Sequence, residues 1–172
     1  MEYVILVDKL DQEIGLMEKI EAHEKGLLHR AFSVLVFNNQ GQMLLQKRAL
    51  SKYHSPGLWT NTCCSHPRKG ESTLQAAHRR LKEEMGFDCD LTFSHTFIYK
   101  VQFDNQLYEH ELDHVFLGTT DLVDFQFNPE EVNEVQFFDV EFIKKDLLEN
   151  EKNYTAWFKI IFENYIYNRK LS

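Results

Sequence analysis

The sequence has little cysteine and no long apolar run, and both absences narrow the kinds of protein it can encode. Only three cysteines occur, Cys63, Cys64 and Cys89, and an odd number with two adjacent residues does not make a disulfide framework. The apolar run at residues 3–7 is flanked by charge and is too short for a signal peptide or a transmembrane helix. Free thiols without a targeting segment predict a cytoplasmic protein.

Positive charge is also scarce. The chain has 19 Lys and Arg against 27 Asp and Glu, which gives a formal net charge of −8 and an isoelectric point near 5.5. An acidic surface repels both a phosphate backbone and an anionic membrane, so we expect neither nucleic acid nor membrane as a partner. A phosphate-bearing small molecule would need a local cluster of cations or a metal ion. Nothing indicates an obligatory protein partner.

Internal repeats, low-complexity tracts and linkers are absent too, and we expect residues 1–172 to form a single domain. A chain of 172 residues suits one domain and leaves little room for two. Its hydrophobic content of 43% supplies enough apolar surface for a core without disulfides. The charged fraction of 27% is typical of a globular chain and not of a disordered one.

The pattern of apolar residues predicts an α+β fold. Strands are expected at Val4–Val7, 31–38, 42–48, 58–64, 91–103, 107–119 and about 134–138, with hairpins around Asn-Gln-Gly at 39–41 and Asp-Asn-Gln at 104–106. Two helices are expected near the end, at about 141–149 and 154–168, whereas residues 8–28 are ambiguous. Strands around a central helix, with helices at the end, indicate an α/β/α sandwich.

Residues 72–85 form the clearest helix. Ser72 and Gln75 make a capping-box pattern, and Gly86 is a typical residue to end the helix. An apolar stripe is expected from Leu74, Ala77, Leu81 and Met85. On the same helix, Arg79 with Glu83 and Arg80 with Glu84 are spaced as ion pairs four residues apart, and taken alone this pattern is typical of a solvated face.

The wider spacing around this helix resembles the Nudix box, G-x5-E-x7-R-E-U-x-E-E-x-G-U, where U is a bulky apolar residue. The matching residues are Glu71, Arg79, Leu81, Glu83, Glu84, Gly86 and Phe87. In that box, carboxylates converge where a divalent metal can bind diphosphate oxygens. Two positions depart, since Ser65 replaces a Gly and Arg80 replaces a metal-binding Glu. Arg80 cannot ligate a cation but can bind a diphosphate. A Nudix-like sandwich, with mixed sheets around the Nudix helix, is therefore predicted without hydrolase activity.

The histidines and two glutamates are further candidates. A lone histidine is more often a surface or structural residue than a metal ligand, and we apply this to His54, His78, His95, His110 and His114. Glu109 and Glu111 differ, because residues two apart in a strand face the same side. If buried without metal, these carboxylates would repel each other, whereas an exposed strand face would need no ligand. Their spacing alone leaves both interpretations open.

Further segments bring the chain close to one family. They are residues 18–23, 28–33, 47–52, 56–61, 64–67, 108–111 and Trp157. On these segments the chain resembles the type I isopentenyl-diphosphate isomerases, a Nudix-like family that lost hydrolase chemistry. The match runs through nearly the whole chain, roughly residues 3–168. The combination of T-N-x-x-C-x-H-P, ending at Pro67, with a downstream E-x-E is highly specific.

The resemblance implies two metal sites and a diphosphate site. The five ligands of one Mn, Zn or Mg ion would be His23, His29, His66, Glu109 and Glu111, a set that suits octahedral coordination. A second ion, Mg, would bind with the substrate diphosphate through Glu84 and the backbone carbonyl of Cys64. The cations that match diphosphate-binding positions are Lys19, Arg48, Lys52 and Arg80. Each of them alone would be an ordinary surface charge.

The reaction implied by the resemblance is the 1,3-proton shift between isopentenyl and dimethylallyl diphosphate in isoprenoid biosynthesis. It needs an acid, a base and a dry pocket, since water would trap the carbocation. Cys64 and Glu111 would handle the protons, in an order left open, and Tyr99 would hydrogen-bond near Glu111. Trp157 would stabilise the cation or merely pack the last helix.

Two other functions compete with isomerisation. The main alternative is a Nudix hydrolase of a nucleoside diphosphate derivative, and Arg80 within the box together with Cys64 beside His66 speaks against it. The second competing function is a metal- or nucleotide-binding module without turnover.

Overall fold

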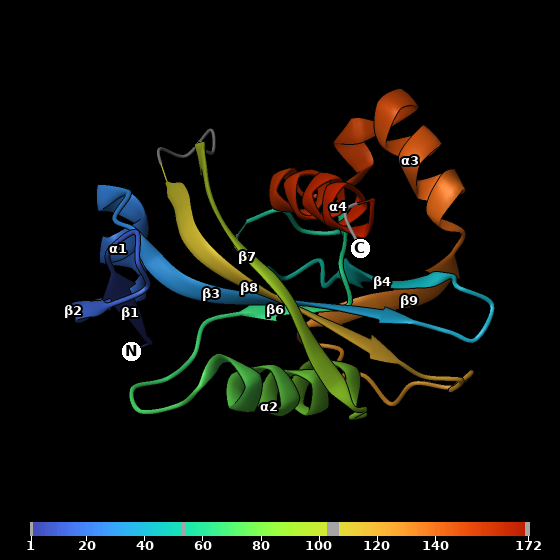
Figure 1. Ribbon diagram of the computed structural model, residues 1–172. Coiled ribbons are helices and arrows are strands. Elements are labelled where there is room, and N and C mark those ends of the chain that lie inside the picture. The colour runs from blue at the N-terminus through green and yellow to red at the C-terminus, as the bar shows by residue number, and fades with distance from the viewer. Residues whose placement is uncertain (1, 53, 103–106, 171–172) are drawn as a thin grey trace.

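The strands of the computed structural model, which describes residues 2–52, 54–102 and 107–170, form one branched sheet (Figure 1). The elements in chain order are β1 (Tyr3–Val7), β2 (Glu13–Glu18), α1 (Lys19–Lys25), β3 (His29–Phe37), β4 (Met43–Arg48), β5 (Trp59–Thr60), β6 (Cys63–Ser65), α2 (Thr73–Met85), β7 (Leu91–Gln102), β8 (Tyr108–Thr119), β9 (Val132–Phe138), α3 (Val140–Glu149), a 3₁₀ turn (Glu151–Asn153) and α4 (Ala156–Arg169). None of the helices among these residues is long and apolar enough to cross a membrane.

Strand β3 organises the sheet. On one side β8 runs parallel to it along its whole length, from His29 opposite Glu111 to Phe37 opposite Thr119. On the other side β3 pairs in turn with β1, β6 and β4, always antiparallel. The remaining strands extend these partners, since β7 pairs with β8, β9 and β5 with β4, and β2 with β1. One parallel pair within an otherwise antiparallel sheet makes it mixed, as predicted.

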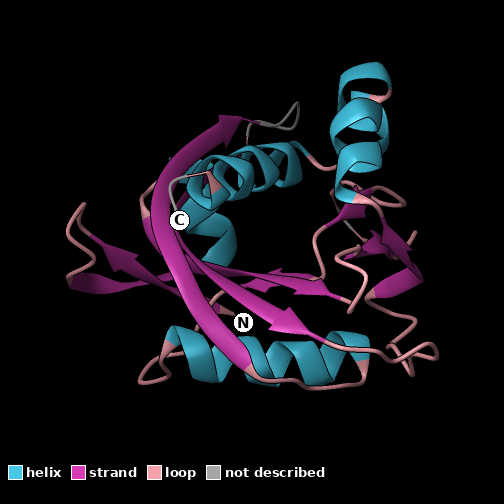
Figure 2. Ribbon diagram, turned by 45° about the vertical axis from the view of Figure 1, so that its right-hand side comes forward, coloured by secondary structure: helices cyan, strands magenta, loops and turns pink. Residues whose placement is uncertain are grey.

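Helices cover both faces of the sheet, with α2 on one side and α4 and α3 on the other (Figures 1 and 2). The alternation of side chains along β3 follows these layers. Phe32 and Val34 pack in the cluster that includes Leu81 of α2, whereas Leu35 packs with Phe158 of α4. The predicted α/β/α sandwich is therefore confirmed.

Helix α2 begins at the predicted cap. The Ser72 hydroxyl accepts the backbone N–H of Gln75 at 3.2 Å, and the Gln75 side chain accepts the N–H of Ser72 at 3.0 Å. The apolar stripe is buried at Ala77, Leu81 and Met85, but Leu74 is 40% exposed, so the stripe prediction is wrong at that residue. Leu74 lies in the first turn of α2, and the residues of this helix that pack in the core begin only at Ala76.

The predicted strand 58–64 is two strands, because the chain crosses there from β4 to β3. Thr60 pairs with β4, and Cys63 pairs with β3. At the crossing, the Thr62 hydroxyl donates to the Leu44 carbonyl at 2.7 Å and accepts the Val36 N–H at 3.0 Å. One side chain thus replaces the ladder between β3 and β4 where the two strands separate.

The other predicted elements lie within about two residues of the observed ones. The ambiguous residues 8–28 contain β2 and α1. The hairpin at 39–41 is confirmed by pairing of Phe37 with Met43, whereas the predicted turn at 104–106 lies outside the described residues.

Replacement of Gly86 by alanine is expected to destabilise the fold by about 2–4 kcal/mol, from left-handed backbone strain plus overpacking. Gly86 has φ +71°, and a Cβ there would meet the backbone carbonyl of Gln126 well inside van der Waals contact. Gly41 is the matched control, since its φ is +77° and nothing lies within 4 Å of an added Cβ. Gly41→Ala should cost only about 1 kcal/mol in denaturant unfolding. Equal losses in the two variants would contradict the packing argument.

Candidate active site

The sheet register places three polar side chains in one row. His29 on β3 is the pairing partner of Glu111 on β8, and Glu111 is in turn the partner of Tyr99 on β7. Paired residues on neighbouring strands project to the same face. The Tyr99 hydroxyl donates to Glu111 Oε2 at 2.7 Å. Three strands from distant parts of the sequence thus supply one continuous polar row.

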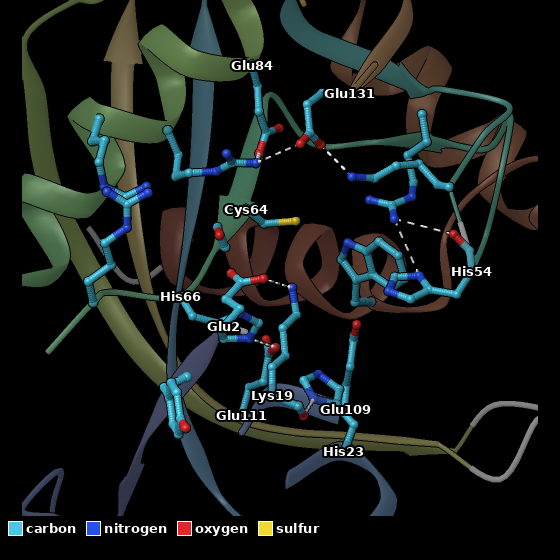
Figure 3. Close-up of a pocket in the computed structure, with 18 of the residues that line it drawn as sticks. Glu2, Lys19, His23, His54, Cys64, His66, Glu84, Glu109, Glu111 and Glu131 are labelled. Atoms are coloured by element: carbon cyan, nitrogen blue, oxygen red, sulfur yellow. Dashed lines mark hydrogen bonds and ion pairs between the residues drawn. The ribbon is translucent and has the colours of Figure 1, made fainter. Parts of the chain in front are cut away.

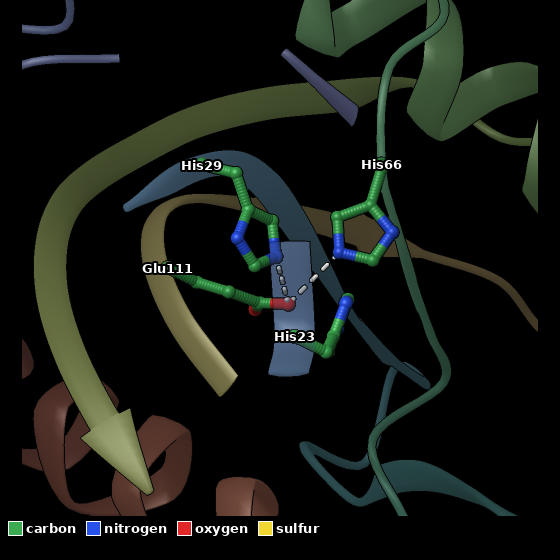
Figure 4. Close-up of side chains that lie close together, drawn as sticks. All are labelled: His23, His29, His66 and Glu111. Atoms are coloured by element: carbon green, nitrogen blue, oxygen red, sulfur yellow. Dashed lines mark hydrogen bonds and ion pairs between the residues drawn. The ribbon is translucent and has the colours of Figure 1, made fainter. Parts of the chain in front are cut away.

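Two more histidines reach this row from outside the three strands. His23 lies on α1, which Glu18 caps by accepting the Glu21 N–H, and His66 follows β6. The nearest ligand atoms of His23, His29, His66 and Glu111 all lie within 4.8 Å of one another (Figure 4). Oε1 of Glu111 is 2.9 Å from Nε2 of His66 and 3.6 Å from Nε2 of His29. All four side chains are buried.

Hydrogen bonds fix the rings of two histidines for metal binding. Nδ1 of His29 lies 2.8 Å from the Leu27 carbonyl, and Nδ1 of His23 lies 2.6 Å from the Lys19 carbonyl. A carbonyl only accepts, so each Nδ1 carries the proton and each Nε2 presents a lone pair. Nε2 of His29 is fully buried and has no hydrogen-bond partner in the described part of the chain. A divalent ion between this lone pair and the Glu111 carboxylate would satisfy both groups, so these residues fit such an ion.

The electrostatics of this cluster favour metal ligation as well. Burial lowers the pKa of His66 to about 4 and also lowers the pKa of His23, so both rings are neutral at pH 7. Burial alone would raise the pKa of Glu111, but the adjacent His29 and His66 outweigh it and hold that pKa well below its usual value. Neutral imidazoles and an ionised carboxylate are the protonation states that bind metal.

Glu109, the fifth predicted ligand, lies beside the cluster and not within it. Its Oε2 is 3.3 Å from the Tyr99 hydroxyl, which it shares with Glu111. Both glutamates are only 7% exposed, so the exposed strand face considered from the sequence is wrong. Burial and the charge of Glu111 raise the pKa of Glu109 well above its usual value. An additional positive charge at this place would remove that repulsion.

A cavity of about 700 Å³ opens beside the cluster (Figure 3). Among the predicted site residues its wall contains Lys19, His23, Arg48, Lys52, Cys64, His66, Arg80, Glu84, Tyr99, Glu109, Glu111 and Trp157. Only His29 is missing from the wall, because it is fully buried behind the cavity. The structure therefore brings all of the predicted site residues to one place.

The four predicted diphosphate-binding cations surround this cavity, and carboxylates neutralise three of them. Lys19 pairs with Glu2 at 3.1 Å, and Lys52 pairs with Glu131 at 2.5 Å. Arg80 contacts Glu84, as its spacing on α2 predicts, and also lies 2.8 Å from Glu83.

Among the described residues, Arg48 has an aromatic partner and no carboxylate within ion-pair distance. Its guanidinium lies 5.2 Å from the centroid of the Trp157 ring. The Nε–H groups of both Arg48 and Arg80 are buried with no acceptor in the described part of the chain. Two unmatched donors at one cavity are suited to an anionic ligand.

The adjacent cysteines face opposite sides of β6. Cys63 is fully buried in the core cluster beneath α2, whereas Cys64 lines the cavity. Loss of hydration and the nearby Glu84 carboxylate raise the pKa of the Cys64 thiol. The cavity therefore contains a protonated thiol and, in Glu111, an ionised carboxylate, which is the pair of states that acid–base chemistry needs.

Two residues that the sequence did not single out also line the cavity. His54 lies outside the cluster of candidate metal ligands in the described residues; its ring stands perpendicular to that of Trp157 at 5.6 Å and lies 3.4 Å from Arg48 Nη2. Burial and the charge of Arg48 lower the pKa of His54 to about 3, so the ring stays neutral. Glu131 is the second, and no local pattern separates it from its neighbour Glu130. The other lone histidines have structural partners or lie away from the site; His110, for example, contacts the Gly26 carbonyl at 2.9 Å.

Comparisons with known proteins agree with this geometry. Residues 27–158 match the NUDIX domain family. The isopentenyl-diphosphate Delta-isomerase of Pectobacterium atrosepticum is 54% identical over 159 residues, which cover 92% of this chain and 88% of that protein. The enzyme of the same name from Serratia proteamaculans is 47% identical, with 95% and 90% covered.

Solved structures extend the likeness at the level of the fold alone. A protein of Deinococcus radiodurans superposes with a TM-score of 0.76 at 18% identity, covering 93% of this chain and 97% of that one. The MutT protein of Methanosarcina mazei gives 0.66 at 19% identity, covering 83% and 96%. The sequence identities over nearly the full length of the relatives decide the narrower grouping: the chain belongs to the type I isopentenyl-diphosphate Delta-isomerase family, within the Nudix superfamily.

Proposed function

We propose that this protein interconverts isopentenyl and dimethylallyl diphosphate by a 1,3-proton shift. The observation that carries the proposal is the composition of one cavity, where a protonated thiol and a carboxylate lie among cations with unmatched N–H donors. The cations suit a diphosphate, whereas the thiol and carboxylate suit movement of a proton on an alkene. The relatives named as isomerases support the same reaction. The binding partner of the protein is accordingly a small diphosphate. Its cytoplasmic location stays a prediction.

Two metal ions belong to the proposal. His23, His29, His66 and Glu111, with Glu109 as the fifth ligand, would hold one Mn, Zn or Mg ion. It would supply positive charge that fixes the protonation state of Glu111. A Mg ion bound with the diphosphate would use Glu84 and the Cys64 carbonyl. Glu84 and Cys64 both line the cavity, which supports binding of one ion by the two residues.

The protein residues divide the reaction between two sides of the substrate. Protonation of the terminal alkene carbon gives a tertiary carbocation, and loss of a proton from the neighbouring methylene gives the isomer. Cys64 and Glu111 would give and take these protons, while Tyr99 holds Glu111 Oε2 in place at 2.7 Å. Trp157, only 2% exposed, packs in the core and also lines the cavity, so its ring can serve both roles considered from the sequence.

The hydrolase alternative lacks a supporting observation. Arg80 replaces a carboxylate of the Nudix box and pairs with Glu83 and Glu84, so a metal site of the hydrolase type loses one ligand and gains a cation. Incubation with isopentenyl diphosphate and Mg²⁺ tests the proposal directly. Formation of dimethylallyl diphosphate supports it, and phosphate release from nucleotides without isomerisation would support the hydrolase.

Metal analysis should find about one tightly held divalent ion per chain after dialysis, because four buried ligands surround it. His29→Gln should lose this ion, whereas His78→Gln should keep it, since His78 pairs with Asp88 outside the cluster. Added Mg²⁺ should still be needed for turnover. Full activity after treatment with a strong chelator, with no ion restored, would refute the metal requirement.

Cys64→Ala should keep the fold and the ion but lose nearly all turnover. Cys63→Ala should cost about 1 kcal/mol of stability, because it removes a small buried group, and should keep most activity. Deuterium incorporation into the product in heavy water measures both variants. If Cys64→Ala incorporates deuterium at the wild-type rate, or if Cys63→Ala incorporates none, Cys64 is not the residue that handles the proton.

Arg80→Glu restores the Nudix box but should not create a good hydrolase. The new carboxylate would stand beside Glu83, Glu84 and Glu131, so the KM for the diphosphate should rise about tenfold or more. Steady-state kinetics and a phosphate-release assay measure the two effects. An unchanged KM would remove Arg80 from the diphosphate site.

A further inference from the structure

The carboxylate of Glu131, which Figure 3 labels, contacts two of the cations proposed to bind diphosphate, Lys52 and Arg80. Its Oε2 is 2.5 Å from Nζ of Lys52, and its Oε1 is 3.5 Å from Nη2 of Arg80. The three side chains are between 19% and 23% exposed, so water screens these contacts only in part. Each carboxylate oxygen therefore serves one cation.

The backbone around Glu131 fixes its position relative to both partners. The Glu131 carbonyl accepts the N–H of Ala49, three residues before Lys52, at 2.9 Å. Asn128 donates its N–H to the carbonyl of Glu84, on the helix of Arg80, at 2.8 Å, and its own carbonyl accepts the N–H of Glu131 at 3.0 Å. The segment 128–131 thus ties the end of β4 to the end of α2, and Glu131 projects from this connection.

The positive charges of Lys52 and Arg80 indicate a role for Glu131 beyond packing. Lys52 and Arg80 repel each other, and both have long side chains that lose freedom when a ligand orders them. Arg80 has Glu83 and Glu84 as further partners, whereas Glu131 is the one carboxylate paired with Lys52 in the described part of the chain. Burial would raise the pKa of Glu131, but the hydrogen bond from Lys52 and the nearby cations lower it, so the carboxylate is ionised.

We propose that Glu131 is a positioning residue that aligns Lys52 and Arg80 for the diphosphate. It holds the two cations side by side before the substrate arrives, and so reduces the freedom lost on binding. This inference rests on the proposed function, because it takes Lys52 and Arg80 as diphosphate ligands. It concerns binding and not proton transfer, since the side-chain partners of Glu131 among the described residues are Lys52 and Arg80, and neither Cys64 nor Glu111.

Simple charge repulsion makes the opposite prediction. If Glu131 were only a negative charge near an anionic ligand, its removal would tighten diphosphate binding. If it aligns the cations, its removal weakens binding. Glutamine tests this directly, because its amide can accept from one cation but turns a donor toward the other. The direction of the affinity change therefore separates the two interpretations.

The experiment compares wild type with Glu131→Gln, Glu131→Asp and the matched control Glu130→Gln, which removes the same charge from an exposed neighbour. Calorimetric titration of metal-loaded protein with inorganic diphosphate and Mg²⁺ gives the affinity, and steady-state isomerase kinetics give KM and kcat. We expect Glu131→Gln to weaken diphosphate binding and raise KM roughly tenfold, with kcat within about twofold. Glu131→Asp should weaken binding as well, because its shorter chain cannot span both cations, and Glu130→Gln should match wild type.

Unchanged or tighter diphosphate binding by Glu131→Gln overturns the inference, and so does a fall in kcat with KM unchanged. These results are distinct from a failure of the proposed function. If wild type binds diphosphate but does not isomerise, the isomerase proposal fails while weaker binding by Glu131→Gln still supports the role of Glu131. If wild type binds no diphosphate, both are overturned.

Discussion

The parallel pairing of β3 with β8 is the constraint on which the site depends. It places His29 directly beside Glu111, and the antiparallel pairing of β8 with β7 adds Tyr99 to the same row. A slip of one residue in either pairing would turn these side chains to the opposite face of the sheet. Residues of β3 buried on both faces, such as Phe32 and Leu35, make such a slip costly, so the hydrophobic core and the metal cluster enforce the same register.

Charge in the cavity is balanced within the protein. An acidic chain carries a group of cations at one place, and Glu2, Glu84 and Glu131 neutralise Lys19, Arg80 and Lys52 there. A diphosphate can therefore bind by replacing these carboxylates as the partner of the cations. Before it binds, the carboxylates neutralise the three cations. Arg48 differs, because its guanidinium lies over the ring of Trp157. Like Arg80, it also keeps a buried Nε–H that has no acceptor among the described residues. This arrangement explains how a protein of net charge −8 can hold a polyanion.

Local patterns predicted the sandwich and the capped helix α2, because each depends on residues close in sequence. Resemblance to a family was needed to collect His23, His66 and Glu111, since no periodicity connects residues so far apart. Neither approach found Glu131 or His54. Lys52 lies 79 positions from Glu131, and Glu130 has the same side chain next to it, so only the fold distinguishes them. The two strands within 58–64 escaped prediction because hydrogen bonds of the Thr62 side chain replace part of the ladder.

The parallel pairing also has a consequence for the order of folding. His29 and Glu111 stand on strands joined by β4, α2 and β7, so they meet only after a long loop has closed. Contacts of this kind form slowly, whereas the antiparallel pair of β7 and β8 and the helix α2 are local and can form early. An ion bound by the four clustered side chains would add its binding energy only to chains that have completed the parallel pair. Such an ion would therefore slow unfolding without guiding the first steps of folding.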